Sequence, residues 1–345
     1  MYSLIRSALF KLDTELTHQL TFNSLDLANS LGLLKYLVPK IPDNPTSVMG
    51  IEFPNPVGLA AGLDKDGDHI DALGNLGFGF IEIGTVTPKP QAGNEKPRLF
   101  RLVEHEAILN RMGFNNKGVD YLLDRVKGRR YRGVLGINIG KNAVTPVEEA
   151  ESDYRIGLQK VYSLADYITV NISSPNTPGL RSLQYGEQLI ALLSCIKEEQ
   201  AKLEQEYRRY VPIAIKIAPD MNDEEIAQVA KTFLELNIDG VIATNTTLSR
   251  DSVAGHPFAK EAGGLSGAPL TDLSTQVITK LRQCLGAEFP IIGVGGIKDG
   301  KSAQEKIAAG ANLVQIYSGL IYRGPRLISE AADAIASAHR SEGTG

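Results

Sequence analysis

The sequence predicts a closed barrel of eight βα units, the (β/α)8 or TIM barrel, preceded by a small N-terminal helical hairpin. Three observations lead to this α/β fold class. The chain has 345 residues, and a barrel of roughly 250 residues would take up most of them. Short apolar runs alternate with longer helical patterns, as in repeated βα units of a parallel sheet. Polar residues follow nearly every apolar run, at the strand ends where a barrel builds its active site.

Eight apolar runs are the predicted barrel strands. They are Val57–Ala60, Ile81–Gly84, Val134–Ile137, Ile168–Val170, Ile213–Ile217, Gly240–Ala243, Ile291–Val294 and Leu313–Ile316. Between the second and third runs, the segments 98–102 and 107–110 indicate an inserted hairpin and loop over the barrel mouth. We expect the barrel domain to occupy residues 45–336, after a proline-rich joint at 39–45.

Residues 1–40 have the pattern of two amphipathic helices. Asp13 or Thr14 can cap the second helix. The apolar positions are Leu4, Ile5, Ala8, Leu9 and Leu12 in the first helix and Leu16, Leu20, Leu27 and Leu31 in the second. Charged residues interrupt this segment too early for a spanning helix, and it lacks the features of a signal peptide. Two interpretations stay open: the hairpin packs flat on its own domain, or it lies in the membrane plane with Arg6 and Lys11 near lipid headgroups.

Composition excludes several classes of protein. The formal net charge is −4, so no overall basic field indicates nucleic acid as the main partner. The two cysteines, Cys195 and Cys284, form no CxxC pair and belong to no Cys/His cluster at metal-ligand spacing. We therefore expect no metal site, and the cysteine usage fits a reducing cytoplasm.

The run Gly295–Ser302 matches the phosphate-loop pattern G-x-x-x-x-G-K-S and lies between a strand and a helix. A P-loop NTPase is therefore one alternative. The chain ends at residue 345, too soon for the rest of a nucleotide-binding sheet, and the next strand ends without an Asp for Mg²⁺. The preferred interpretation is that backbone amides after strands seven and eight bind the phosphate of a cofactor.

Amide and ammonium side chains dominate the predicted strand ends. Asparagine offers a donor and an acceptor to a neutral cyclic imide or amide, and four asparagines are in position: Asn110, Asn171, Asn176 and Asn245. Lys65 can meet a carboxylate of the same ligand. Lys216 stands between apolar residues that would bury it, so we expect it to face a negative charge such as that of reduced flavin. By composition alone, the segment 171–181 is also compatible with an ordinary capped turn.

Taken in series, these motifs resemble the dihydroorotate dehydrogenase family from about residue 45 to residue 325. The matching segments are Ala60–Lys65, Asn110–Phe114, Asn171–Arg181, Ile242–Thr247, Gly263–Gly267 and the two glycine turns. The resemblance is to class 2, the membrane-associated and quinone-reducing branch. Ser174 stands where class 1 enzymes have a cysteine base, and a helical extension precedes the barrel.

The resemblance implies a function. The chain would oxidise dihydroorotate to orotate through FMN and reduce a membrane quinone, in de novo pyrimidine (UMP) biosynthesis. Ser174 would remove the C5 proton while hydride passes from C6 to flavin N5, with Thr177 or a water as onward relay. The enzyme would be a peripheral protein at the cytoplasmic face of the cell membrane, in contact through its N-terminal helices. A soluble fumarate- or NAD-linked flavin dehydrogenase of the same fold remains an alternative beside the NTPase.

The resemblance also implies three groups of site residues. The substrate group is Lys65, Asn110, Arg111, Met112, Gly113, Phe114, Asn171, Asn176, Asn245 and Thr246. The FMN group is Ala61, Gly62, Leu63, Asp64, Lys65, Thr85, Asn138, Asn171, Lys216, Thr244, Gly267, Gly296, Tyr317 and Ser318. The quinone path would include His18, Arg101 and Tyr317.

Overall fold

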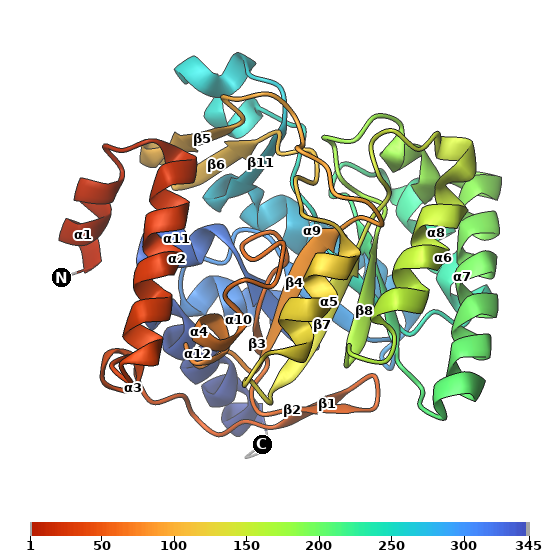
Figure 1. Cartoon of the computed structure of the whole chain (residues 1–345), viewed down its shortest axis with the longest axis horizontal. Coiled ribbons are helices and arrows are strands. Elements are labelled where there is room, and N and C mark those ends of the chain that lie inside the picture. Colours follow the sequence, from red (N-terminus) through yellow and green to blue (C-terminus); the bar gives the residue numbers. More distant parts are fainter. Residues whose placement is uncertain (1, 343–345) are drawn as a thin grey trace.

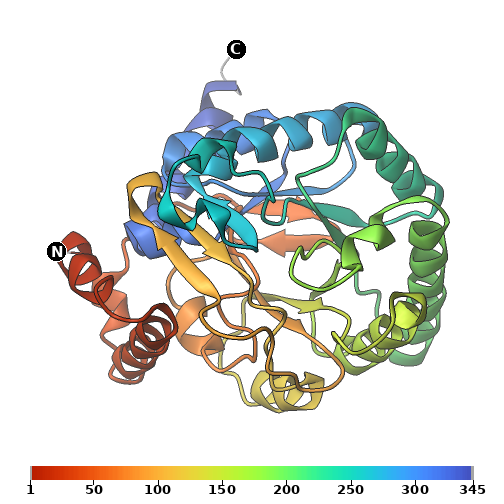
Figure 2. The ribbon, with the colours of Figure 1, turned by 90° about the horizontal axis from the view of Figure 1, so that it is seen from above.

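A computed structural model describes residues 2–342, and its centre is a closed barrel of eight parallel strands (Figure 2). The strands are β3 (Val57–Leu59), β4 (Phe80–Val86), β7 (Val134–Ile139), β8 (Tyr167–Asn171), β9 (Ile213–Ile217), β10 (Gly240–Ala243), β12 (Ile291–Val294) and β13 (Leu313–Ile316). The last strand pairs with the first and closes the ring. All eight predicted strands are confirmed.

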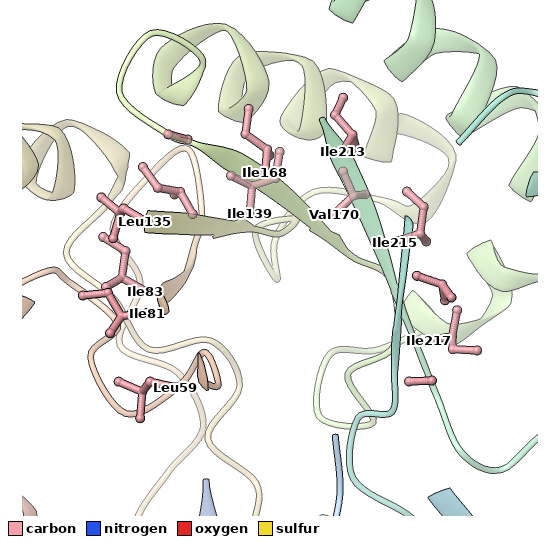
Figure 3. Close-up of a cluster of buried hydrophobic side chains, with 14 of the residues drawn as sticks. Leu59, Ile81, Ile83, Leu135, Ile139, Ile168, Val170, Ile213, Ile215 and Ile217 are labelled. Carbon is pink, nitrogen blue, oxygen red and sulfur yellow. The ribbon is translucent and has the colours of Figure 1, made fainter. Parts of the chain in front are cut away.

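Helices surround the barrel as an outer ring (Figures 1 and 2). They are α4 (Ile70–Gly74), α5 (Val119–Lys127), α6 (Ala150–Val161), α7 (Gly186–Tyr207), α8 (Asp223–Glu235), α9 (Thr271–Leu285), α10 (Gly300–Ala308), α11 (Ser318–Arg323) and α12 (Arg326–Glu342). The main core fills the space between ring and barrel, where aliphatic side chains of successive strands form one cluster (Figure 3). Because side chains alternate along a strand, every second residue points into the barrel instead.

The barrel interior is apolar at its lower end and polar in the middle. Phe80 packs edge-on against Phe53, with ring centroids 5.0 Å apart. Phe53 belongs to a short hairpin of β1 (Thr46–Val48) and β2 (Ile51–Phe53), which the sequence analysis did not predict. Two residues after Phe80 on the same strand, the buried carboxylate of Glu82 accepts hydrogen bonds from Asn138 (2.8 Å), Tyr167 (2.9 Å) and Gln315 (2.7 Å). This polar layer forms the base of the barrel mouth.

A small antiparallel sheet stands beside the mouth (Figure 1). It consists of the predicted hairpin, β5 (Leu99–Leu102) and β6 (Ala107–Asn110), and of β11 (Gly264–Gly267), which pairs with β6. The hairpin is confirmed. Strand β11 was not predicted, since its sequence Gly-Leu-Ser-Gly has neither alternation nor β-branched residues.

The two predicted N-terminal helices are present as α1 (Tyr2–Leu9) and α2 (Thr14–Ser30), followed by the short α3 (Leu34–Leu37). Asp13 is the cap of α2 and accepts a hydrogen bond from the Leu16 amide at 2.9 Å. The side chains of Leu4, Ile5 and Ala8 lie outside the described residues. In Figure 2 this hairpin lies outside the helical ring, at one side of the barrel.

The hairpin packs with only one face on the barrel. Phe22 of α2 is buried there, whereas the predicted apolar positions Leu16, Leu20, Leu27 and Leu31 are exposed. Arg6, which one of the two interpretations placed near lipid headgroups, donates a hydrogen bond to the Tyr322 carbonyl at 2.8 Å. Within residues 2–342 no helix combines the length and apolar character needed to cross a bilayer.

Candidate active site

A cavity of about 990 Å³, including its open entrance, lies at the carboxyl ends of the barrel strands. Residues from nearly every strand end and from β6 and β11 line it, because parallel strands of a barrel end at one face. The predicted residues among them are Ala61, Gly62, Lys65, Thr85, Asn110, Met112, Gly113, Phe114, Asn171, Ser174, Asn176, Lys216, Thr244, Asn245, Thr246, Gly267, Gly296, Tyr317 and Ser318.

The four predicted asparagines meet in this cavity and orient one another. The amide of Asn176 donates to Asn110 Oδ1 at 3.2 Å, and that of Asn245 lies 3.4 Å from Asn171 Oδ1. Asn171 in turn donates to Thr85 Oγ1 at 3.0 Å. Side chains fixed in this way present a set of donors and acceptors to a flat polar ligand without further reorganisation.

Ser174 is buried on the loop after β8 and lines the same cavity. Its Oγ accepts a hydrogen bond from the backbone N–H of Asn176 at 3.2 Å. Arg181 secures the loop by donating to the carbonyls of Ser173 (3.0 Å) and Thr246 (2.8 Å). The buried hydroxyl of Thr177 has no hydrogen-bond partner among the described residues. These hydrogen bonds therefore fix the position of the Ser174 hydroxyl at the cavity.

Two lysines bring positive charge to the cavity. Burial lowers the pKa of Lys65 to about 8, although Asp66 acts in the opposite direction. Lys216 points into the barrel because its neighbours Ile215 and Ile217 point outward, and burial lowers its pKa as well, with Glu82 opposing. Neither lysine has an ion pair within residues 2–342. A buried cation without a partner is costly, so both positions favour anionic ligand groups.

Glycines shape the far end of the cavity. Gly295 and Gly296 follow β12 with φ of 123° and 74°, a region where side chains are strained. A Cβ on Gly296 would lie 2.2 Å from Thr271 Oγ1. The hydroxyls of Ser266 and Ser318 lie 2.8 Å apart nearby. Backbone amides and hydroxyls at one end and the unpaired Lys216 within the cavity fit a flavin that carries a phosphate.

Four residues of the predicted substrate and FMN groups do not line this cavity. Leu63 belongs to the main core, and Asn138 lies below, where its Oδ1 accepts a hydrogen bond from Thr85 at 2.6 Å. The Asp64 carboxylate accepts hydrogen bonds from the backbone N–H groups of Asp68 and His69 and so orders its own loop. Arg111 does not line the cavity and donates to the Glu261 carboxylate at 2.6 Å, so its substrate contact stays a prediction from the resemblance.

A second, more polar cavity lies between α2 and the barrel. His18, Lys65, Met112 and Tyr317 line it, and the last three also line the first cavity, so the two cavities share a wall. Burial lowers the pKa of His18 to about 4, which keeps the imidazole neutral. Arg101 is not a lining residue; it donates to the Phe10 carbonyl at 3.1 Å and holds the turn between α1 and α2.

The phosphate-loop pattern at 295–302 has another role in the structure. Asp299 is the cap of α10 and accepts a hydrogen bond from the Ser302 amide at 2.8 Å. Ser302 Oγ is engaged by that cap, and Lys301 points outward, 3.7 Å from Glu305. A P-loop lysine would instead reach the bound phosphates. The NTPase alternative is therefore wrong.

Several cavity residues were absent from the predicted groups. They are Ala60, Pro175, Ser266, Leu270, Val294, Ile297 and Gln315, whereas Gly295 and Gly319 belong to the two glycine turns that were predicted to bind a phosphate. The alternation along β13 was a usable signal for Gln315, since Leu313 and Gln315 share the inward face. Ser266 lies in the family-like segment Gly263–Gly267, but its residue type alone gave no signal, because its position depends on the pairing of β11 with β6.

Comparisons with known proteins agree with this geometry. The family model for dihydroorotate dehydrogenase matches residues 45–338. The dihydroorotate dehydrogenase (quinone) of Cellvibrio japonicus is 62% identical over 342 residues, which are 99% of this chain and 100% of the relative. That of Saccharophagus degradans is 64% identical over 98% of this chain and 100% of its own. A crystal structure of DHODH from Eimeria tenella in complex with ferulenol superposes with a TM-score of 0.86 at 38% identity, over 96% of this chain and 93% of that one.

Proposed function

The chain belongs to the dihydroorotate dehydrogenase family, and from this premise we propose that it is the quinone-dependent enzyme of de novo pyrimidine synthesis. It oxidises dihydroorotate to orotate, with FMN as the electron carrier and a membrane quinone as the final acceptor. The observation that carries the proposal is the convergence of Ser174, Lys65 and four asparagines on one face of a cavity that also holds the unpaired Lys216 and the glycine turn.

The residues around the cavity fit FMN, and FMN supplies, when bound, an acceptor for the C6 hydride and a donor of electrons to quinone. Lys216 would offset negative charge on the flavin ring. The turn Gly295–Gly296, Ser318 and Gly267 would hold the phosphate end. Thr85 and Thr244 contribute polar contacts from the ends of β4 and β10.

Dihydroorotate is an anion with a cyclic imide, and the cavity matches both parts. Lys65 binds the carboxylate, while Asn110, Asn171, Asn176 and Asn245 bind the ring, with Thr246 as a further contact. The hydroxyl of Thr246 is buried without a partner in the described part of the chain, so a ligand group would satisfy it. Met112, Gly113 and Phe114 close this side of the cavity.

Ser174 is the base that takes the C5 proton while hydride leaves C6. An unassisted hydroxyl is a weak base, so its surroundings must favour the deprotonated oxygen. The backbone N–H of Asn176 donates to this oxygen, and the unpaired hydroxyl of Thr177 on the same buried loop is a candidate for the onward relay. Two bonds to hydrogen break, a C5=C6 double bond forms, and two electrons leave with the hydride.

The second cavity and the hairpin support a route for quinone. His18 and Tyr317 line the cavity beside the flavin site, and Arg101 orders the hairpin turn. The exposed leucines of α2 form an apolar face suited to the boundary of a bilayer, and we place the protein at the cytoplasmic face of the cell membrane. A soluble fumarate- or NAD-linked enzyme would have no use for this apolar face.

The test is spectroscopic. Dihydroorotate is added anaerobically to the purified yellow protein, the flavin absorbance is followed, and a soluble ubiquinone analogue is then supplied. Bleaching followed by recovery with quinone is the expected result. Bleaching without recovery by quinone, but with recovery by fumarate or NAD⁺, would move the protein to the soluble branch. Absence of bleaching would remove dihydroorotate as the substrate.

A further inference from the structure

Lys306 of α10 is a fully buried lysine with no role in the reaction. Its ammonium donates to the Thr271 carbonyl at 2.7 Å, to Ser274 Oγ at 2.6 Å and to Thr275 Oγ1. These acceptors are all neutral and all lie in the first turns of α9. No carboxylate of the described residues is within ion-pair distance. A buried charge held by neutral oxygens alone needs a structural or functional reason.

The first turn of α9 also contacts the glycine turn Gly295–Gly296 of the cavity. Thr271 Oγ1 lies within hydrogen-bond distance of two carbonyls, that of Gly296 at 2.8 Å and that of Ala268 at 2.9 Å. Ser274 Oγ donates to the Gly295 carbonyl at 2.9 Å and shares its proton with carbonyls of its own helix. An ammonium can only donate, so Ser274 must accept from Lys306 and direct its one proton to a carbonyl. The proton of Ser274 therefore cannot point at Lys306 and is left for the carbonyls of Gly295, Leu270 and Thr271.

Peptide geometry converts this arrangement into a binding surface. The peptide bonds after Gly295 and after Gly296 are trans, so each N–H points opposite to the carbonyl of the same peptide. Both carbonyls point back to α9. The amides of Gly296 and Ile297 consequently point away from α9, and both residues line the cavity. Two adjacent N–H groups in a glycine turn form an anion-binding concavity.

We infer that Lys306 is the positioning residue of the phosphate site: through Thr271 and Ser274 it holds the amides of Gly296 and Ile297 toward the phosphate of FMN. The inference rests on the proposed function, because it takes the anion to be the cofactor phosphate. Lys306 lies behind the turn and does not line the cavity, so it acts through the helix turn and through its charge.

The charge of Lys306 is sensitive to pH near neutrality. Burial lowers its pKa to about 7, against the influence of Asp272 on α9 and Glu305 on α10. The ammonium is therefore present below pH 7 and is lost as the pH rises. A phosphate on the far side of the turn favours the ammonium, so FMN binding takes up a proton above pH 7 and FMN affinity falls there.

The experiment compares FMN with riboflavin, which has the same ring and no phosphate. Full-length protein is freed of flavin by dialysis, and both dissociation constants are measured by quenching of flavin fluorescence between pH 6 and 9. Lys306→Met should weaken FMN binding by about tenfold, with riboflavin nearly unchanged. The FMN-to-riboflavin affinity ratio should fall with pH in the natural protein and be flat in the variant.

Two further variants keep the inference testable if Lys306→Met does not fold. Ser274→Ala removes the link to Gly295 and should also lower the ratio. Thr275→Ala is the matched control, since Thr275 accepts from Lys306 but its own proton goes to the Thr271 carbonyl, within α9. An equal loss of both flavins, or an unchanged ratio in Lys306→Met and Ser274→Ala, would overturn the inference. Failure of the natural protein to bind FMN would instead overturn the proposed function.

Discussion

The barrel mouth and the N-terminal hairpin place their distinctive side chains in opposite ways. At the mouth, polar side chains converge inward and hold each other with hydrogen bonds, as between Asn176 and Asn110. On α2, apolar side chains such as Leu20 and Leu27 point outward and touch no core. The mouth suits a small water-soluble ligand, whereas the exposed leucines of the hairpin are the basis of its proposed membrane contact. Each region can therefore be impaired while the other is left intact.

The largest expected effect separates chemistry from the hairpin. Ser174→Ala removes the proposed base and should slow flavin reduction by dihydroorotate by about 10²–10⁴-fold, measured by anaerobic stopped-flow absorbance. Membrane binding should not change. Ser182→Ala, an exposed serine of the same loop region, is the control. Near-normal reduction in Ser174→Ala would assign the proton to another group.

The next prediction tests the charge of Lys65 at the barrel mouth. The pKa of Lys65 is depressed to about 8, so its ammonium is present below pH 8 and is lost as the pH rises through that value. The KM for dihydroorotate should therefore increase above pH 8, by up to about tenfold per unit. In Lys65→Met the KM should be high throughout and flat across this range. A natural protein whose KM is constant from pH 7 to 9.5 would contradict the assignment.

A third change tests the proposed membrane contact of the hairpin. The triple variant Leu16→Glu, Leu20→Glu and Leu27→Glu should lose most of its binding to phospholipid vesicles, by about a hundredfold or more in a sedimentation assay. Flavin reduction by dihydroorotate should be unaffected. Leu234→Glu on α8 is the matched control, because Leu234 is 46% exposed and Leu16 is 47% exposed. Equal losses in the control and the triple variant would show that these leucines are not a specific contact.

The smallest effect concerns the attachment of the hairpin. Asp26 of α2 lies 2.6 Å from His69 and is partly exposed, so the pair contributes only about 0.2–1 kcal/mol. Asp26→Asn should increase limited proteolysis at the α2–barrel junction by up to about fivefold. Asp71→Asn, which breaks a pair with Arg130 within the barrel, should leave that rate unchanged.

The sequence was most informative where periodicity and residue chemistry coincide. Short apolar runs such as Ile213–Ile217 predicted the strands, and polar residues directly after them, such as Asn171, predicted the cavity wall. The prediction failed where placement depends on pairing between distant segments. Ser266 reaches the cavity only because β11 pairs with β6, some 150 residues earlier in the chain. The direction of the Arg111 side chain depends on Glu261, which is equally remote in sequence.

Glu82 and its partners inside the barrel have a consequence for protein engineering. Barrel interiors are usually filled by branched aliphatic side chains, and a buried polar cluster is often less stable than well-packed apolar residues of similar volume. Here Glu82 is bonded to Tyr167 and Gln315 below the cavity and acts on the pKa of Lys216. Selection for heat resistance alone would favour apolar substitutions in this layer. The resulting proteins would unfold at a higher temperature. They would also lose the effect of Glu82 on the pKa of Lys216, so activity would be exchanged for stability.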